Sequence, residues 1–310
     1  MYFPYLYGRR AELLALRDVA PHLTRWKTTP VIEPANLDPG DLVRCLQGLD
    51  AEGASCCLIV NPSQGQFTAG GLAPWLAKIR GFVANPAVVR PTFQVFGAGD
   101  RPALQVFLRN HHGRDVAVVV RTADLPPAAL ATDLAGSSAI VFLHARSNPG
   151  AYARALPRGA AVEVAPRFNV QARNADYNGP EWLTSSHQTY LADGLPGFSD
   201  FGPLPPTFSL RGGQAAAVAI HLTYEEGDGS IWVQHFVSDS TEIGDGDVTS
   251  KMAEATKKVF DAVRADPTKF VVSPGVQAYI DQHATRRPTN LTMNKRQQIS
   301  HHLATVGPLV

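Results

Sequence analysis

Short apolar runs of strand length, separated by turn residues, dominate the first 224 residues of the chain. Most of these runs are hydrophobic throughout and do not alternate with polar residues, which is typical of strands covered on both faces, as in parallel sheets wrapped by helices. The runs are TPVIEP (29–34), SCCLIVNP (55–62), RPTFQVFG (90–97), DVAVVVR (115–121), SAIVFLHA (138–145), AAVEVAP (160–166), GFSDF (197–201) and AAAVAIHLTY (215–224).

Segments with helical character lie between several of these runs. We expect helices within 38–52, 70–84, 100–112 and 178–193, and room for only one or two helical turns after the fourth and fifth runs. A strand followed by a helix, repeated along the chain, indicates parallel βα units. Eight such strands predict an α/β fold, a (β/α)8 TIM-like barrel with irregular later units.

The pattern changes after residue 224. The segment EEGDGS joins the eighth run to IWVQHFVSD (231–239), which predicts an antiparallel hairpin after strand eight. Helices are expected over 245–266, near 274–284 and at the C-terminal KRQQISHHLATV, and another over 9–23 that closes the bottom of the barrel. We therefore predict one domain, residues 1–310, with an N-terminal closing helix and a C-terminal helical extension.

Composition narrows the setting of the protein. Among 310 residues the formal net charge is +1 with a pI near 7.8, so no basic excess supports direct binding of nucleic acid. Cys45, Cys56 and Cys57 show no disulfide framework and no metal-type spacing, which fits a reduced, cytoplasmic setting. No apolar stretch is long enough for a signal sequence or a membrane span, so neither is expected.

Polar residues stand at the C-terminal ends of the expected strands, and in a closed barrel these ends meet at one mouth, where such barrels place their chemistry. Three of them can perform acid–base work at that mouth, and others can hold an anionic ligand. The candidate catalytic residues are Glu33, Asp200 and His221. The candidate ligand-binding residues are Asn61, Arg121 and Arg167, with Arg173, Asp176 and Tyr177 on a lid formed by residues 171–182.

Each candidate also has a structural interpretation. Glu33 can serve in an ion pair with one of the arginines, Asn61 can cap a turn, and Arg121 can pair with Asp124. In the lid, Asp176 can cap a helix while its neighbours stay in solvent. His144, another strand-end residue, fits equally a hydrogen-bonded core histidine and an acid–base residue.

Metal and cofactor signals are weak. His221 and His235 lie on adjacent strands and can face each other near Asp239, yet no close histidine spacing supports a metal ion, so no metal site is predicted. Signatures of serine hydrolases, nucleotide-binding loops and zinc proteases are missing, and the cofactor is unknown. The glycines of LRGGQ (210–214) are too weak a signal to predict a phosphate-binding loop, although a glycine-rich loop before strand eight resembles the place where barrels often hold phosphate.

Several motifs resemble those of an uncharacterised bacterial family related to the phage beta-protein family. They are MYFPYLYGRRAELLALRD, VIEP, RNADY, GFSDF, AVAIHLTY, HFVSD and QISHHL, spread over nearly the whole chain. The resemblance implies a (β/α)8 barrel from a phage–host conflict locus, with a small nuclease-like protein as a neighbour, and it implies no established activity. The segment RRPTNLTMNK replaces the glycine-rich turn usual in that family.

Two functions follow from these observations. The first is a hydrolase or lyase that acts on a nucleotide-like or phosphorylated ligand in the polar pocket. The second is a non-catalytic barrel that binds or regulates a nuclease-like effector. A polar pocket that receives Glu33, Asp200 and His221 together favours the enzyme, whereas ion pairs that tie up these side chains favour the binding protein.

Overall fold

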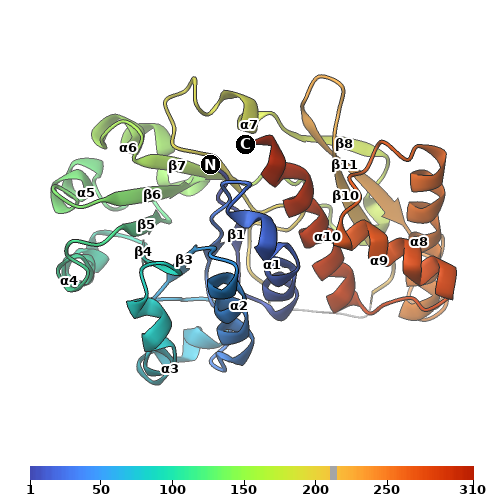
Figure 1. Cartoon of the computed structure of the whole chain (residues 1–310), viewed down its shortest axis with the longest axis horizontal. Helices are drawn as coiled ribbons and strands as arrows, with labels where there is room; N and C mark the ends of the chain where they lie inside the picture. The colour runs from blue at the N-terminus through green and yellow to red at the C-terminus, as the bar shows by residue number, and fades with distance from the viewer. Residues whose placement is uncertain (210–214) are drawn as a thin grey trace.

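Eight parallel strands form the larger of two sheets in this computed structural model, which describes residues 1–209 and 215–310 (Figure 1). A backbone bridge from Tyr2 to Phe198 joins the two edges of this sheet and closes it into a barrel, and a second bridge from Tyr2 to Thr28 extends the pairing on the other side. In order around the barrel, the strands are β1 (Tyr5–Leu6), β2 (Val31–Ile32), β3 (Cys56–Ile59), β4 (Val89–Val95), β5 (Val116–Val120), β6 (Ala139–His144), β7 (Ala161–Ala165) and β9 (Ser199–Asp200).

Helices surround the barrel and cover its outer face, so the strands are buried on both sides. All five residues of β5, for example, are buried although they alternate between the barrel interior and the helical layer. This double burial explains the continuously apolar runs. The surrounding helices are α1 (Arg10–Leu23), α2 (Gly40–Ala51), α3 (Leu72–Ala84), α4 (Arg101–Asn110), α5 (Pro127–Asp133) and α6 (Pro149–Ala155).

The predicted eight-stranded parallel barrel is confirmed, but the prediction of its eighth strand is wrong. The eighth strand comes from the start of the chain as β1, while the run 215–224 contributes β10 (Ala219–Glu225) to a different sheet. Only Tyr5 and Leu6 form β1, between Pro4 and Gly8, which is too short for a recognisable apolar run. Consequently α1 connects two barrel strands and does not close the barrel bottom.

The second sheet has three antiparallel strands in the order β10, β11 (Ile231–Val237) and β8 (Pro180–Thr184). The expected hairpin and C-terminal helices are confirmed, the latter as α8 (Val248–Ala265), α9 (Pro274–Thr285) and α10 (Leu291–Val306). The helix expected in 178–193 is wrong, because most of its length forms β8, a turn and the short α7 (Ser186–Thr189). Pairing with β11, which aligns Trp182 with Trp232, overrides the local helical pattern.

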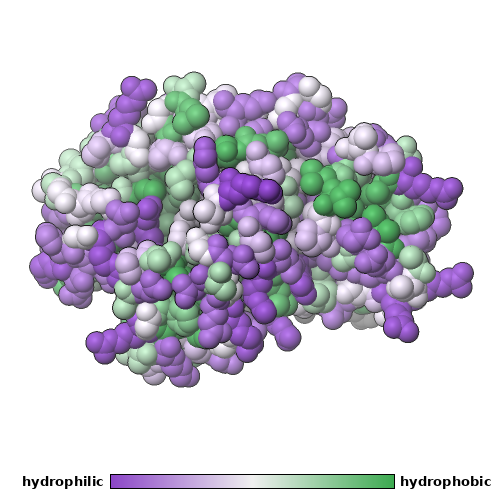
Figure 2. Space-filling model, viewed as in Figure 1, coloured by the Kyte–Doolittle hydropathy of each residue, from purple (hydrophilic) through white to green (hydrophobic). Residues whose placement is uncertain are grey.

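The last long helix, α10, lies between α1 and β10 and joins the barrel to the second sheet (Figure 1). A two-point contact between Arg296 and Asp18 fastens it to α1, with nitrogen–oxygen distances of 2.5 and 2.7 Å. The face in Figure 2 is mostly hydrophilic, with a hydrophobic area over the C-terminal helices. No helix among the described residues is long and apolar enough to cross a membrane. The glycine-rich loop 210–214 lies outside the described residues.

Candidate functional site

A pocket of about 450 Å³ opens at the C-terminal ends of the barrel strands. Its floor and walls come from residues that follow or end different strands: Tyr7, Phe96, Arg121, His144 and Phe201. Residues 206–208 form one side, and Arg146 and Gln64 also line it. A single pocket therefore collects polar and aromatic side chains from most of the circumference of the barrel, as the closed fold predicts.

Strand alternation decides which strand-end residues reach this pocket. On β5 the side chains of Ala117 and Val119 pack in the barrel interior, so Arg121, two residues further, also points inward. The same alternation places Glu33 after Val31 and Tyr7 after Tyr5 on the inner side. The inward side chains of neighbouring strands thus meet at the mouth.

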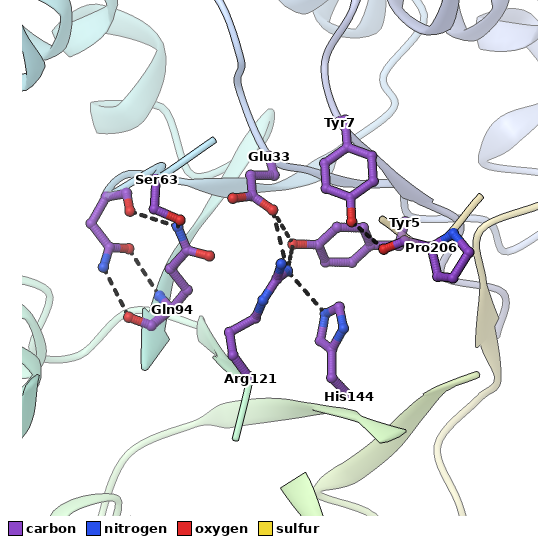
Figure 3. Close-up of polar contacts among 9 residues, drawn as sticks. Tyr5, Tyr7, Glu33, Ser63, Gln94, Arg121, His144 and Pro206 are labelled. Atoms are coloured by element: carbon purple, nitrogen blue, oxygen red, sulfur yellow. Dashed lines mark hydrogen bonds and ion pairs between the residues drawn. The ribbon is translucent and has the colours of Figure 1, made fainter. Parts of the chain in front are cut away.

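Glu33 and Arg121 form a buried ion pair beneath the pocket (Figure 3). The Arg121 Nη1 group lies 3.2 Å from Glu33 Oε2, and their side chains are 12% and 0% exposed. Tyr5 connects the pair, because Arg121 Nη1 donates to its hydroxyl oxygen at 2.7 Å and that hydroxyl donates to Glu33 Oε2 at 2.7 Å. Burial alone would lower the pKa of Arg121. The electrostatic interactions of its guanidinium with Tyr5 and Glu33 outweigh this effect and raise the pKa, so the guanidinium stays charged.

His144 completes the contacts of Arg121. Its Nε2 lies 3.2 Å from Arg121 Nη1, and since arginine can only donate, Nε2 accepts and the imidazole proton lies on Nδ1. Burial and the neighbouring guanidinium hold the pKa of His144 well below 6.5. A neutral, half-buried histidine therefore lines the pocket with an Nδ1–H donor.

The loop that follows β9 covers part of the mouth. The Tyr7 hydroxyl donates to the carbonyl of Pro206 at 2.5 Å (Figure 3). Phe208 packs edge-on against the Tyr7 ring. The Arg9 guanidinium lies 4.4 Å from the centre of the Phe208 ring. Burial raises the pKa of Tyr7 to about 12, although the Arg121 guanidinium opposes this effect. Tyr7 thus remains a neutral hydroxyl that fixes the loop.

Asn61 lies beside the pocket floor and acts structurally. Its side chain extends the pairing of β3 with β4, donating to the carbonyl of Gln94 and accepting from the amide of Gln94, both at 2.9 Å. The Gln94 side chain returns the contact by donating to the Asn61 carbonyl at 2.8 Å and to Ser63 Oγ at 3.2 Å. This mutual pairing gives Asn61 a structural role. The role is to extend the pairing of β3 with β4, and not to cap a turn as expected.

The placement of Asp200 at the mouth is wrong. Its neighbours Ser199 and Phe201 face the barrel interior, and Asp200 points outward toward α10. The Tyr2 hydroxyl donates to Asp200 Oδ1 at 2.8 Å and accepts from His302 Nε2 at 3.0 Å. Burial raises the pKa of Asp200, but His302, Tyr2 and the Gly202 amide outweigh it and lower the pKa. Asp200 is part of a buried contact between the barrel and α10.

The placement of His221 at the mouth is also wrong, because β10 belongs to the antiparallel sheet. His221 faces His235 across the hairpin as expected, with 2.8 Å between the two Nδ1 atoms. Burial lowers the pKa of His221 to about 3. Tyr177 packs on both histidine rings, while Asp239 pairs with Lys258. No metal-binding group of three or more His, Cys, Asp or Glu residues occurs among the described residues.

The remaining predicted ligand contacts lie away from the pocket. Arg167 donates to Ser186 Oγ at 2.9 Å. Arg173 and Asp176 pair with each other at 2.8 Å on the surface. Tyr177 is buried, and its hydroxyl oxygen accepts from the amide of Gln171. Residues 171–177 therefore lead into β8 and do not form a lid over the mouth.

The structure brings together Glu33 and Arg121 from the predicted set, with Asn61 beside them, and adds residues that the sequence analysis did not select. Tyr5 and Tyr7 alternate in the segment YLY, the strand signal that could have identified them. Phe96 and Phe201 follow their strands directly. Comparison of the chain with protein-family models, with curated proteins and with solved structures gave no match.

Proposed function

We propose that the mouth pocket binds a small anionic ligand of nucleotide-like character, with Arg121 as its anchor. The observation that carries this proposal is the arrangement of Arg121. The hydrogen bonds that its side chain makes to Glu33, Tyr5 and His144 all use Nη1. Apart from a further interaction of the guanidinium with Tyr7, the described residues leave its Nε and Nη2 groups for a carboxylate or phosphate, which an arginine held in place recognises through two parallel hydrogen bonds.

The walls of the pocket support a ligand that also has a flat ring. Phe96 is 38% exposed, and its ring centre lies 5.7 Å from the Arg121 guanidinium. Phe201 and Phe208 stand on the other side of the pocket. Aromatic faces stack on nucleobases with little dependence on the base, whereas an anion alone needs no such walls. Glu33 neutralises much of the Arg121 charge, so the ring contacts must contribute to affinity.

The test of this proposal is a thermal-shift screen of nucleotides and sugar phosphates against the wild-type chain and Arg121→Lys. A ligand at 100 times its Kd stabilises the fold by about 2.7 kcal/mol, which appears as a higher Tm. Lysine keeps the charge beside Glu33 but loses the planar fork, so we expect Arg121→Lys to weaken binding by about tenfold or more.

Arg90→Lys is the matched control for this screen. Arg90 pairs with Asp115 at the N-terminal ends of β4 and β5, at the opposite end of the barrel from the pocket. Its replacement should leave the ligand-induced shift unchanged. The proposal is wrong if no nucleotide or sugar phosphate raises the Tm, or if the two lysine variants respond alike.

A second function, acid–base catalysis as a hydrolase or lyase, is favoured by one observation, the neutral His144 in the pocket wall. In this alternative His144 exchanges the proton, and the proposed catalytic roles of Asp200 and His221 are abandoned. His144→Gln is then expected to stop conversion of a stabilising phosphate ester, measured as product by mass spectrometry, while the thermal shift persists. Conversion that continues at the wild-type rate would leave the pocket as a binding site. A role in phage–host conflict and a nuclease-like partner remain predictions from the family resemblance.

A further inference from the structure

Two buried oxygen atoms below the mouth pocket have no hydrogen-bond donor among the described residues. They are Glu33 Oε1 and Gln94 Oε1, and both residues are 0% exposed. In Glu33 the other oxygen, Oε2, receives the hydrogen bonds from Tyr5 and Arg121. Burying an acceptor without a donor is unfavourable, and more so when the acceptor is charged.

The orientation of Gln94 is fixed by its own contacts. Its Nε2 donates to the carbonyl of Asn61 at 2.8 Å and to Ser63 Oγ at 3.2 Å. Turning the amide over would set Oε1 against the Asn61 carbonyl, where two acceptors would face each other. Gln94 Oε1 is therefore directed away from Asn61, and in Figure 3 it and the free oxygen of Glu33 are turned toward the same space.

The chemistry of this space selects a particular ligand group. Both oxygens can only accept, so they cannot satisfy each other while Glu33 is ionised. A group with at least two N–H bonds, an amino or ammonium group, can donate one hydrogen to each oxygen. A water molecule can also donate to both oxygens and would be displaced by such a ligand group, whereas a ligand hydroxyl has only one hydrogen to give and an anion would be repelled by Glu33.

Glu33 and Gln94 do not line the pocket themselves, but residues next to them do. Gln64 lines the pocket and directly follows Ser63, which contacts Gln94, while Arg121 lines the pocket and contacts Glu33. Glu33 and Gln94 thus lie below the stretch of pocket between Gln64 and Arg121. Because both oxygens are buried, a ligand group reaches them only if side chains above the pair, such as the half-buried Gln64, are displaced.

We propose that Glu33 Oε1 and Gln94 Oε1 form an amino-group subsite of the mouth pocket. This inference rests on the proposed function, and it narrows the ligand to an anion that also carries an amino group, such as an amino-bearing nucleotide. Arg121 holds the anionic part of such a ligand, and the subsite discriminates against analogues in which the amino group is missing.

The test compares ligands that differ only in the amino group. Isothermal titration of the wild-type chain with guanosine and inosine monophosphate, and with adenosine and purine riboside monophosphate, varies one amino group in each pair. In at least one pair we expect the amino-bearing member to bind about tenfold tighter or more, because buried acceptors reject an analogue that leaves them unpaired. Equal affinities within both pairs overturn the subsite and leave the anion site standing. Failure of all four compounds to bind overturns the subsite, and the thermal-shift screen with the two lysine variants then decides the proposed function.

Glu33→Gln provides a second, independent measurement. The oxygen of the new glutamine can keep the contacts with Tyr5 and Arg121, and its amide nitrogen Nε2 then donates to Gln94 Oε1. The variant thus fills the subsite with the amide NH2 group of its own glutamine. We therefore expect the preference for the amino-bearing nucleotide to vanish, while both members of each pair still bind. Glu163→Gln, the same exchange at an exposed position on β7, should retain the wild-type preference. A preference that survives in Glu33→Gln contradicts the proposal. If that variant does not fold, the ligand pairs on the wild-type chain decide.

Discussion

Replacement of Asp200 by alanine is expected to lower the free energy of unfolding by about 3–5 kcal/mol, the usual cost of removing one partner from a buried charged contact. Without the carboxylate, the Tyr2 hydroxyl and the Gly202 amide lose their acceptor in a region where both Asp200 and Tyr2 are 0% exposed. The loss extends further, because Tyr2 orders His302, whose Nδ1 in turn accepts from the Thr223 hydroxyl at 2.8 Å. Denaturant unfolding of the variant and the wild type measures this difference.

The control for Asp200 is Asp239→Ala. Asp239 is 73% exposed and pairs with Lys258 on the surface, so its removal should change stability by less than about 1 kcal/mol. The nucleotide-induced thermal shift should persist in Asp200→Ala, because Asp200 points away from the pocket. Normal stability combined with loss of ligand binding would instead return Asp200 to the functional site.

The order of the barrel strands and the residues of the core are largely predictable, because strands buried on both faces appear in the sequence as continuous apolar runs. Seven of the eight barrel strands correspond to apolar runs that are visible in the sequence. The helices around the first half of the barrel lie in the segments between these runs. β1 was missed because its two residues lie in an aromatic segment interrupted by Pro4. Its place in the barrel depends on parallel pairing with Val31 and Ile32, a contact that no local pattern reports.

The eighth run was misplaced for a related reason. β10 is buried along nearly its whole length, since α8 and α10 lie against it, so its apolar run looks like that of a barrel strand. An antiparallel strand with one solvent-exposed face would show alternating apolar and polar residues, and that pattern would distinguish it from a barrel strand. His221 was assigned to the mouth as a consequence of this error.

Asp200 shows what a strand-end rule cannot decide. Adjacent residues on a strand point to opposite faces, so a shift of one residue moves a side chain from the barrel interior to the helical layer. In GFSDF the sequence does not show which residues face the barrel interior and which face the helices, because both faces of β9 are buried. Arg121 lines the pocket and Glu33 lies beneath it, because each follows a strand whose inward positions continue in the same alternation.

Acidification is expected to destabilise the fold strongly because two histidines are buried in neutral form. Burial lowers the pKa of His221 to about 3 and that of His301 to about 4, whereas both titrate near 6.5 when the chain is unfolded. His301 is held neutral between the Thr223 carbonyl and the Ser273 hydroxyl. Between pH 6.5 and these lowered values the unfolded chain binds more protons, so the free energy of unfolding falls as the pH falls.

The stability is fully present above pH 6.5. Below that pH the expected loss is about 1.4 kcal/mol per pH unit for each of these histidines, and it grows down to about pH 4. Urea unfolding at intervals from pH 7.5 to pH 4.5 measures the slope. His221→Phe should reduce the slope by about 1.4 kcal/mol per pH unit, the contribution of one proton. Phenylalanine fits among Tyr177 and Phe168 and does not titrate. His112→Phe, at an exposed histidine, should leave the slope unchanged. Identical slopes for the two variants would mean that His221 accepts a proton in the folded chain, which its contact with His235 in an aromatic surrounding opposes.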